Sequence, residues 1–158
     1  METPSLVVES HSSRETRGWG RRLASRLTGG ELIALSGDLG VGKTCFVKGL
    51  ARGLDLSEDR ILSPTFTMIQ EHHGRLALFH IDLYRLDHVA IDDLGLREYL
   101  FSDGVAAVEW FERLREADDL DRVAVSIAFA GASNRRIEFA AVGDRYALLI
   151  DELKREFA

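Results

Sequence analysis

The chain has 158 residues, 46% of them hydrophobic and 29% charged, which is ordinary for a globular protein with a real core. Twenty basic against 26 acidic side chains give a formal net charge of −6, so a chain that holds RNA or DNA unaided is not expected. No segment is apolar for long enough to be a signal peptide or to span a membrane. One cysteine, Cys45, cannot form an internal disulfide. We therefore expect a single domain over residues 1–158 that works in a reducing cytoplasm.

The first elements along the chain are a short apolar strand at residues 3–9 and a helix. Ser12 and Glu15 form a pattern typical of a capping box, with Ser12 as the N-cap. The helix that follows should end at Gly29-Gly30. Its outward faces carry five arginines: Arg14, Arg17, Arg21, Arg22 and Arg26. They indicate either a solvated surface or a docking surface for an acidic partner or for RNA held by a partner.

A glycine-rich stretch follows a predicted buried strand at residues 31–36 and precedes apolar positions at helical spacing from 46 to 54. It matches the pattern G-x-x-x-x-G-K-[ST] and consists of Gly37, Asp38, Leu39, Gly40, Val41, Gly42, Lys43 and Thr44. A strand, such a loop and a helix are typical of a nucleoside triphosphate site, because backbone N–H groups and a helix N-terminus converge on phosphate oxygens. Lys43 would reach the β- and γ-phosphates, and Thr44 would ligate Mg²⁺.

The rest of the chain favours an α/β fold. Strands are expected at residues 68–71, 75–84, 105–108, 122–130 and 137–141, with helices at 91–101 and from Asp144 onward. The run at 105–108 is small and apolar throughout, as in a parallel strand buried on both faces. This order predicts a P-loop NTPase-like three-layer sandwich, with a mostly parallel central sheet and antiparallel hairpin additions.

Two carboxylates close predicted strands. Glu109 follows residues 105–108, like a Walker B strand that ends in Glu rather than Asp, and Asp82 closes the apolar part of 75–84. Because ligands of open α/β sheets lie at the carboxyl ends of strands, both could serve a bound triphosphate, or each could be an exposed strand-end acid. We take Glu109, Asp82 and Lys43 as the candidate catalytic residues. Thr65 could offer its hydroxyl to Mg²⁺ or the γ-phosphate, or could cap its own backbone.

Five blocks of sequence, in the same order, resemble the bacterial ATPase of tRNA threonylcarbamoyladenosine biosynthesis, the TsaE family. They lie at residues 37–44, 63–67, 80–86, 94–100 and 108–110. The resemblance implies a cytoplasmic, Mg²⁺-dependent P-loop ATPase that is weak alone. It would act with a sugar-kinase-like threonylcarbamoyl transferase subunit and the paralogous partner of that subunit. Together they would modify the adenosine next to the anticodon, tRNA position 37, and the chain would meet tRNA only through this complex.

The resemblance also assigns residues by matching position. The loop backbone and Lys43 would hold the phosphates of ATP or ADP, and Thr44 and Glu109 would hold Mg²⁺, directly or through water. The other positions implied at the nucleotide are Asp82, Thr65, Thr16 and Arg135, the last two beside the adenine. Cys45 stands where the family often has Thr, a departure that removes no proposed phosphate or metal group.

Two other functions fit a glycine loop of this kind. A small-molecule P-loop kinase would need an acceptor pocket and usually an arginine-bearing lid, and no Arg-rich insertion interrupts the predicted strands. A nucleotide-gated binding switch is the second alternative, since residues 92–95 contain a D-x-x-G pattern. The guanine-reading N-K-x-D is absent, because the only lysines are Lys43, Lys48 and Lys154. We therefore expect ATP and ADP to bind in preference to GTP.

Overall fold

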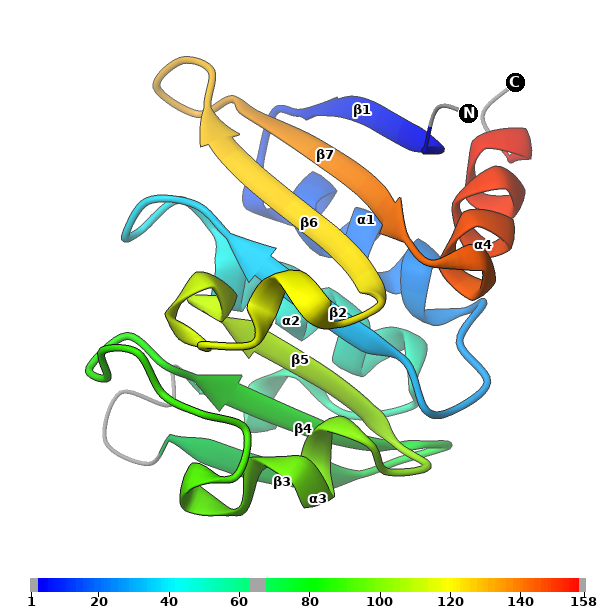
Figure 1. The fold of residues 1–158 in the computed structure, drawn as a ribbon. Coiled ribbons are helices and arrows are strands. Elements are labelled where there is room, and N and C mark those ends of the chain that lie inside the picture. The colour runs from blue at the N-terminus through cyan, green and yellow to red at the C-terminus, as the bar shows by residue number, and fades with distance from the viewer. Residues whose placement is uncertain (1–2, 63–67, 157–158) are drawn as a thin grey trace.

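The computed structural model describes residues 3–62 and 68–156, which form one seven-stranded sheet flanked by helices (Figure 1). The strands are β1 (Ser5–Ser10), β2 (Leu32–Ser36), β3 (Ile69–His73), β4 (Ala77–Asp82), β5 (Val105–Glu109), β6 (Arg122–Phe129) and β7 (Arg135–Val142). Their order across the sheet is β1-β7-β6-β2-β5-β4-β3. Strand β2 pairs in parallel with β5 and β6, and β4 pairs in parallel with β5, whereas the outer pairs are antiparallel. The predicted fold class is confirmed.

Helices on both faces of the sheet complete three layers (Figure 1). Helices α1 (Ser13–Ala24), α2 (Lys43–Gly53) and α4 (Asp144–Arg155) share the larger apolar core with one face, where the rings of Phe46 and Phe139 lie 5.9 Å apart. The short helix α3 (Leu96–Leu100) and neighbouring 3-10 turns cover a smaller core on the other face. Within the described ranges, no helix has the length and apolar character needed to cross a membrane.

Helix α1 begins as predicted but ends earlier. The Oγ of Ser12 accepts a hydrogen bond from the Glu15 N–H at 3.1 Å, while the Glu15 carboxylate accepts from the His11 N–H at 2.6 Å rather than from Ser12. The prediction that the helix continues to Gly29-Gly30 was wrong. Arg75, which is remote in sequence, donates to the carbonyl oxygens of Ala24, the last residue of α1, and of Leu27 at 2.8 and 2.9 Å, and so provides donors for carbonyl groups at the end of the helix.

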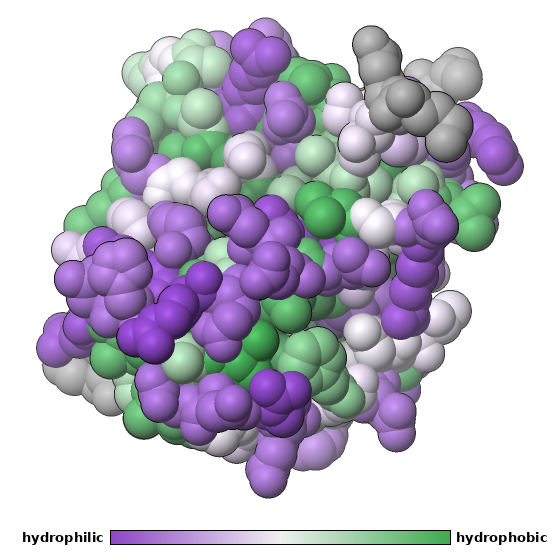
Figure 2. Space-filling model, in the orientation of Figure 1, coloured by the Kyte–Doolittle hydropathy of each residue, from purple (hydrophilic) through white to green (hydrophobic). Residues whose placement is uncertain are grey.

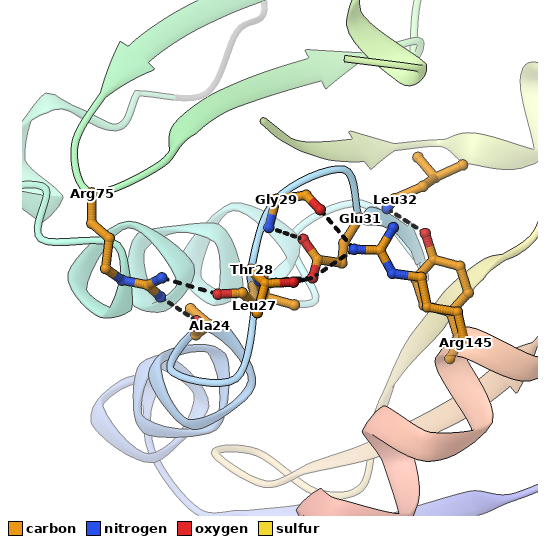
Figure 3. A network of polar contacts seen from close by, with 9 residues as sticks. Ala24, Leu27, Thr28, Gly29, Glu31, Leu32, Arg75 and Arg145 are labelled. Atoms are coloured by element: carbon orange, nitrogen blue, oxygen red, sulfur yellow. Dashed lines mark hydrogen bonds and ion pairs between the residues drawn. The ribbon is translucent and has the colours of Figure 1, made fainter. Parts of the chain in front are cut away.

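A network of polar contacts holds the turn between α1 and β2 (Figure 3). The buried carboxylate of Glu31 accepts from the backbone N–H groups of Thr28 and Gly29, both at 2.8 Å, and pairs with Arg145 at 3.2 Å. The hydroxyl of Tyr146 accepts from the first N–H of β2 at 2.9 Å. These contacts fix the amino end of β2 and, through the strand, the position of the loop at its carboxyl end.

The face of the molecule seen in Figure 2 carries mostly charged and polar side chains with apolar ones between them, and no large apolar patch stands out in that view. The exposed large apolar side chains include Leu39, in the glycine-rich loop, and Tyr84, just beyond β4. Both lie at the carboxyl-end edge of the parallel strands. This edge is therefore the part of the fold where function is to be sought.

Candidate nucleotide-binding site

The glycine-rich loop, residues 37–44, joins the carboxyl end of β2 to α2, as predicted. Gly37, Gly40 and Gly42 have φ angles of 143°, 78° and 122°, which residues with a side chain rarely adopt. A Cβ at Gly37 would also clash with the carbonyl oxygen of Ile127 on β6. The loop backbone therefore depends on glycine at these positions, and it lies against the amino end of α2.

Lys43, the first residue of α2, is buried in this loop. Its Nζ donates to the carbonyl oxygens of Gly37 and Asp38, the second at 3.1 Å, and lies 4.2 Å from the centre of the Trp110 ring. Burial lowers the pKa of Lys43, and the charge of Glu109 is the largest influence in the opposite direction. A buried ammonium group with carbonyl oxygens as its hydrogen-bond partners is well placed to bind an anion.

Glu109 has neighbours in three elements, the strands β2 and β4 and the helix α2. It ends β5 and pairs in register with Leu35 of β2 on one side and Asp82 of β4 on the other. The Thr44 Oγ1 donates to its two carboxylate oxygens at 2.9 and 3.2 Å, and the His80 Nε2 lies 2.5 Å from its Oε2. The structure thus brings together Thr44 and Glu109, the two side chains expected to hold Mg²⁺.

These two oxygen donors fit a small hard cation. Mg²⁺ is commonly held by one or two carboxylates or hydroxyls together with the phosphates of its substrate and water. The described part of the chain contains no cluster of three or more His, Cys, Asp or Glu side chains able to hold a metal by itself. A cation bound beside Thr44 could take further ligands from phosphate and water.

Asp82 lies beside Glu109 at the end of the neighbouring strand. Its Oδ1 accepts from the Tyr84 N–H at 2.8 Å. Burial raises the pKa of Asp82, although the Tyr84 hydrogen bond acts in the opposite direction. The Trp110 ring lies 5.1 Å from that of Tyr84, and Trp110 has a φ of 58°, an uncommon value for a residue with a side chain. This backbone turn carries the indole over Lys43.

Two hollows adjoin the loop, and both are lined in part by Gly40, Gly42 and Cys45. The carboxylate hollow, of about 450 Å³, is completed by Leu39, Lys43, Thr44, Asp82, Tyr84, Glu109 and Trp110. The α1 hollow, of about 530 Å³, is completed by His11, Ser12, Ser13, Thr16, Val41, Ala132, Ser133 and Arg135. Because they share one stretch of loop, a single elongated ligand could occupy both.

The walls of the α1 hollow contain the two residues predicted beside the adenine. Thr16 is buried and its Oγ1 lies 2.7 Å from the Ser10 Oγ. Arg135 donates through Nε to the Val41 carbonyl oxygen at 2.8 Å, and its guanidinium lies 4.5 Å from the Phe129 ring centre. Their contact with adenine stays a prediction. Two further predicted residues, Asp38 and Leu39, belong to the loop itself.

One predicted residue cannot be placed and one residue at the site was missed. Thr65 lies outside the described residues. His80 was not predicted to take part, yet it is completely buried against Glu109. Two sequence signals were available for it: His80 begins the block at residues 80–86, and the alternation along β4 places it on the same face as Leu78 and Asp82.

Comparisons with known proteins agree with this fold and with the motifs. The family model described as "Threonylcarbamoyl adenosine biosynthesis protein TsaE" matches residues 10–137. The tRNA threonylcarbamoyladenosine biosynthesis protein TsaE of Bacillus subtilis is 43% identical over 143 residues, which cover 89% of each chain. Its namesake from Treponema pallidum is 41% identical over 132 residues, or 83% of this chain and 97% of the relative.

A solved structure extends the likeness to the whole fold. The crystal structure of Bacillus subtilis YdiB superposes with a TM-score of 0.83 at 35% identity, covering 100% of this chain and 99% of that one. The sequence matches likewise extend over most of the chain, well beyond the glycine-rich loop. The chain therefore belongs to the TsaE family of threonylcarbamoyladenosine biosynthesis proteins.

Proposed function

We propose that this chain is the Mg²⁺-dependent ATPase subunit required for threonylcarbamoyladenosine modification of tRNA at the adenosine next to the anticodon. The observation that carries the proposal is the convergence of Lys43, Thr44 and Glu109 on one glycine-rich loop at the carboxyl end of β2. Relatives that carry the TsaE name are assigned by that name to the same modification.

In this proposal ATP or ADP lies along the loop and enters both hollows. The phosphates occupy the carboxylate hollow, where they replace the carbonyl groups of Gly37 and Asp38 as partners of the Lys43 ammonium. The nucleoside occupies the α1 hollow between Thr16 and Arg135. The backbone N–H groups of the loop and the amino end of α2 complete the phosphate site.

Thr44 and Glu109 would hold Mg²⁺, Thr44 directly and Glu109 directly or through water. A Mg²⁺ ion held there would supply positive charge that stabilises the negative charge developing on the phosphates as the terminal bond breaks. Asp82, beside Glu109, would accept a hydrogen bond from the attacking water and orient it. Trp110 and Tyr84 shield the Lys43 side of the site, which strengthens the attraction between its ammonium group and phosphate.

The proposed ATPase is slow alone and becomes effective when docked on its partners. These are the sugar-kinase-like threonylcarbamoyl transferase subunit and its paralogue, and tRNA is met through them in the cytoplasm. Leu39 and Tyr84, 67% and 38% exposed at the carboxylate hollow, offer apolar contact where nucleotide state would be sensed. Hydrolysis can be coupled to docking only if the partners bind one nucleotide state more tightly than the other.

Calorimetric titration with ATP, ADP and GTP, with and without Mg²⁺, tests the nucleotide assignment. We expect ATP and ADP to bind with Mg²⁺ dependence and GTP to bind more weakly. ATP consumption is then measured with the chain alone, with the two partners, and with candidate small-molecule acceptors. Stimulation by the partners supports the proposal. Equal binding of GTP would contradict the adenine site, and consumption driven by an acceptor alone would favour a small-molecule kinase.

A further inference from the structure

His80 is a completely buried histidine whose side chain makes one polar contact among the described residues. Its Nε2 lies 2.5 Å from the Glu109 Oε2. Its other ring nitrogen, Nδ1, has no hydrogen-bond partner in the described part of the structure. Buried polar atoms usually have a hydrogen-bond partner, and one left without a partner lowers the stability of the fold. If position 80 on β4 served only to fill space, an apolar side chain would do so without leaving a buried nitrogen unpaired.

In the hydrogen bond between His80 and Glu109, the donor and the acceptor can be assigned. An ionised carboxylate only accepts hydrogen bonds, so the His80 Nε2 donates to Glu109. Glu109 in turn accepts from the Thr44 Oγ1 at 2.9 Å. A hydroxyl has one hydrogen to donate and two lone pairs, so a Thr44 hydrogen committed to Glu109 leaves the lone pairs free for a cation. The three side chains therefore form a directed chain from β4, through β5, to the amino end of α2.

We propose that His80 is a positioning residue for the Mg²⁺ site, which rests on the proposed function above. By donating to one carboxylate oxygen, His80 fixes the orientation of Glu109. Glu109 then holds the Thr44 hydroxyl so that its lone pairs face the carboxylate hollow. Without this donor, the Glu109 side chain can rotate and the Thr44 hydroxyl loses its fixed acceptor. Outer partners that orient metal ligands typically change metal affinity 10- to 100-fold when they are removed.

Two amide substitutions separate the contact from the space that His80 fills. In His80→Gln the amide nitrogen can reach the place of Nε2 and donate to Glu109, whereas in His80→Asn it lies nearer the place of Nδ1. His80→Phe fills the space without a donor. His72→Asn is the matched control, since His72 lies on the neighbouring strand β3 and also has a buried ring nitrogen, Nε2, without a partner among the described residues.

The measurement is ADP affinity by calorimetry, first in EDTA and then over a range of Mg²⁺ concentrations. In EDTA we expect each folded variant to bind ADP within about twofold of the parent. We expect the Mg²⁺ concentration for half-maximal enhancement to rise about 10- to 100-fold in His80→Asn and His80→Phe. His80→Gln and His72→Asn should stay near the parent. Circular dichroism identifies the folded variants, and either donor-deficient variant is sufficient for the test.

The outcomes that reject the two proposals differ. A folded His80→Asn or His80→Phe protein that binds ADP with the Mg²⁺ dependence of the parent would overturn the role of His80 and leave the proposed function intact. A parent protein that binds no adenine nucleotide, with or without Mg²⁺, would overturn the proposed function itself. Loss of ADP affinity in EDTA as well would also reject the inference, because it would show general damage to the site.

Discussion

Two buried carboxylates lie near opposite ends of strand β2, and they have different surroundings: Glu31 directly precedes the strand, and Glu109, the last residue of β5, pairs with Leu35 near its carboxyl end. At the amino end, Glu31 accepts from the backbone N–H groups of Thr28 and Gly29 and pairs with Arg145. At the carboxyl end, Glu109 lies beside Asp82, another buried acid, and near an ammonium group whose pKa is lowered by burial. The Glu31 carboxylate therefore has hydrogen-bond donors and an opposite charge within the chain. Near Glu109, by contrast, several buried charged groups lie together, and a bound phosphate and cation would balance their charges.

Burial alone does not distinguish the two carboxylates, because both are 4% exposed; the groups around them do. Charges with a complete set of partners inside the chain stabilise the fold, whereas charges with perturbed pKa values gathered in a hollow are typical of binding and catalytic sites. Substitutions at the amino end should therefore change mainly stability, and those at the carboxyl end mainly ligand affinity.

The largest effect is expected for Glu31→Ala, which should lower the free energy of unfolding by roughly 3 kcal/mol. The substitution leaves buried backbone donors without an acceptor and Arg145 without its carboxylate. Urea unfolding followed by circular dichroism measures the change. Glu152→Ala removes an exposed partner of Arg26 and should change the same quantity by less than about 1 kcal/mol. Equal losses in the two variants would refute the special role of the amino-end network.

Lys43→Ala should lower ligand affinity more than it lowers stability, the reverse of Glu31→Ala. We expect ATP affinity to fall about 10- to 150-fold, because a charge-assisted contact contributes about 1.5–3 kcal/mol. The unfolding free energy without nucleotide should change far less than in Glu31→Ala, since burial already disfavours the ammonium group. Calorimetry and urea unfolding measure the two quantities. Lys48→Ala, one turn further along α2, is the control and should bind ATP like the parent.

A smaller effect on affinity is expected for Arg135→Gln, which tests the α1 hollow. The substitution removes the hydrogen bond that holds the Val41 carbonyl, a contact of about 0.5–1.5 kcal/mol, so ADP affinity should fall about 2- to 10-fold. The neighbouring Arg136 points to the opposite face of β7, and Arg136→Gln should leave the affinity unchanged. A fall of the same size in both variants would indicate a loss of general charge rather than of the loop contact.

The smallest expected effect is a change in how the melting temperature depends on pH. The pKa of Asp82 is higher in the folded chain than in the unfolded chain, so its carboxylate lowers stability once the pH rises through that raised pKa. Asp82→Asn keeps an acceptor for the Tyr84 N–H and cannot ionise. It should therefore melt at a higher temperature than the parent at pH 7, with a gain that disappears as the pH falls toward 3.8.

Asp92→Asn provides a control of opposite sign for that experiment. The Arg97 guanidinium beside Asp92 lowers the pKa of this exposed carboxyl, so its ionised form stabilises the fold. This stability is present above the usual carboxyl pKa and is lost as the pH falls through the lowered one. The variant should therefore melt slightly below the parent at pH 7. A gain at both positions would show that the melting temperature responds to net charge rather than to local surroundings.

Much of the site could be predicted from sequence because its signals are local or follow from topology. The loop is a contiguous pattern, and the structure places it between a strand and a helix as predicted. Glu109 and Asp82 are adjacent because each ends a strand, and parallel strands β4 and β5 bring their carboxyl ends to one edge. The expected hairpin of β6 and β7 was also correct, since both strands alternate clearly in sequence.

The parts that could not be predicted depend on contacts between distant segments. Arg75 donates to carbonyl oxygens at the end of α1, a contact that no local helix signal reveals. The partner of Glu31 is Arg145, more than a hundred positions away in the chain. The contact of His80 with Glu109 requires the register of β4 against β5. The sequence shows that each of these positions is polar, but not which group each side chain would contact.

Cys45, directly after the glycine-rich loop, is a natural site for chemical labelling. It is the one cysteine in the sequence, its Sγ lies 3.4 Å from the Ser13 carbonyl oxygen, and it borders both hollows. A ligand that extends from one hollow to the other would pass over this thiol. A maleimide reagent should therefore modify the chain at a single position, and more slowly when ATP is present. The natural sequence thus allows occupancy of the loop to be followed by mass spectrometry without an engineered residue.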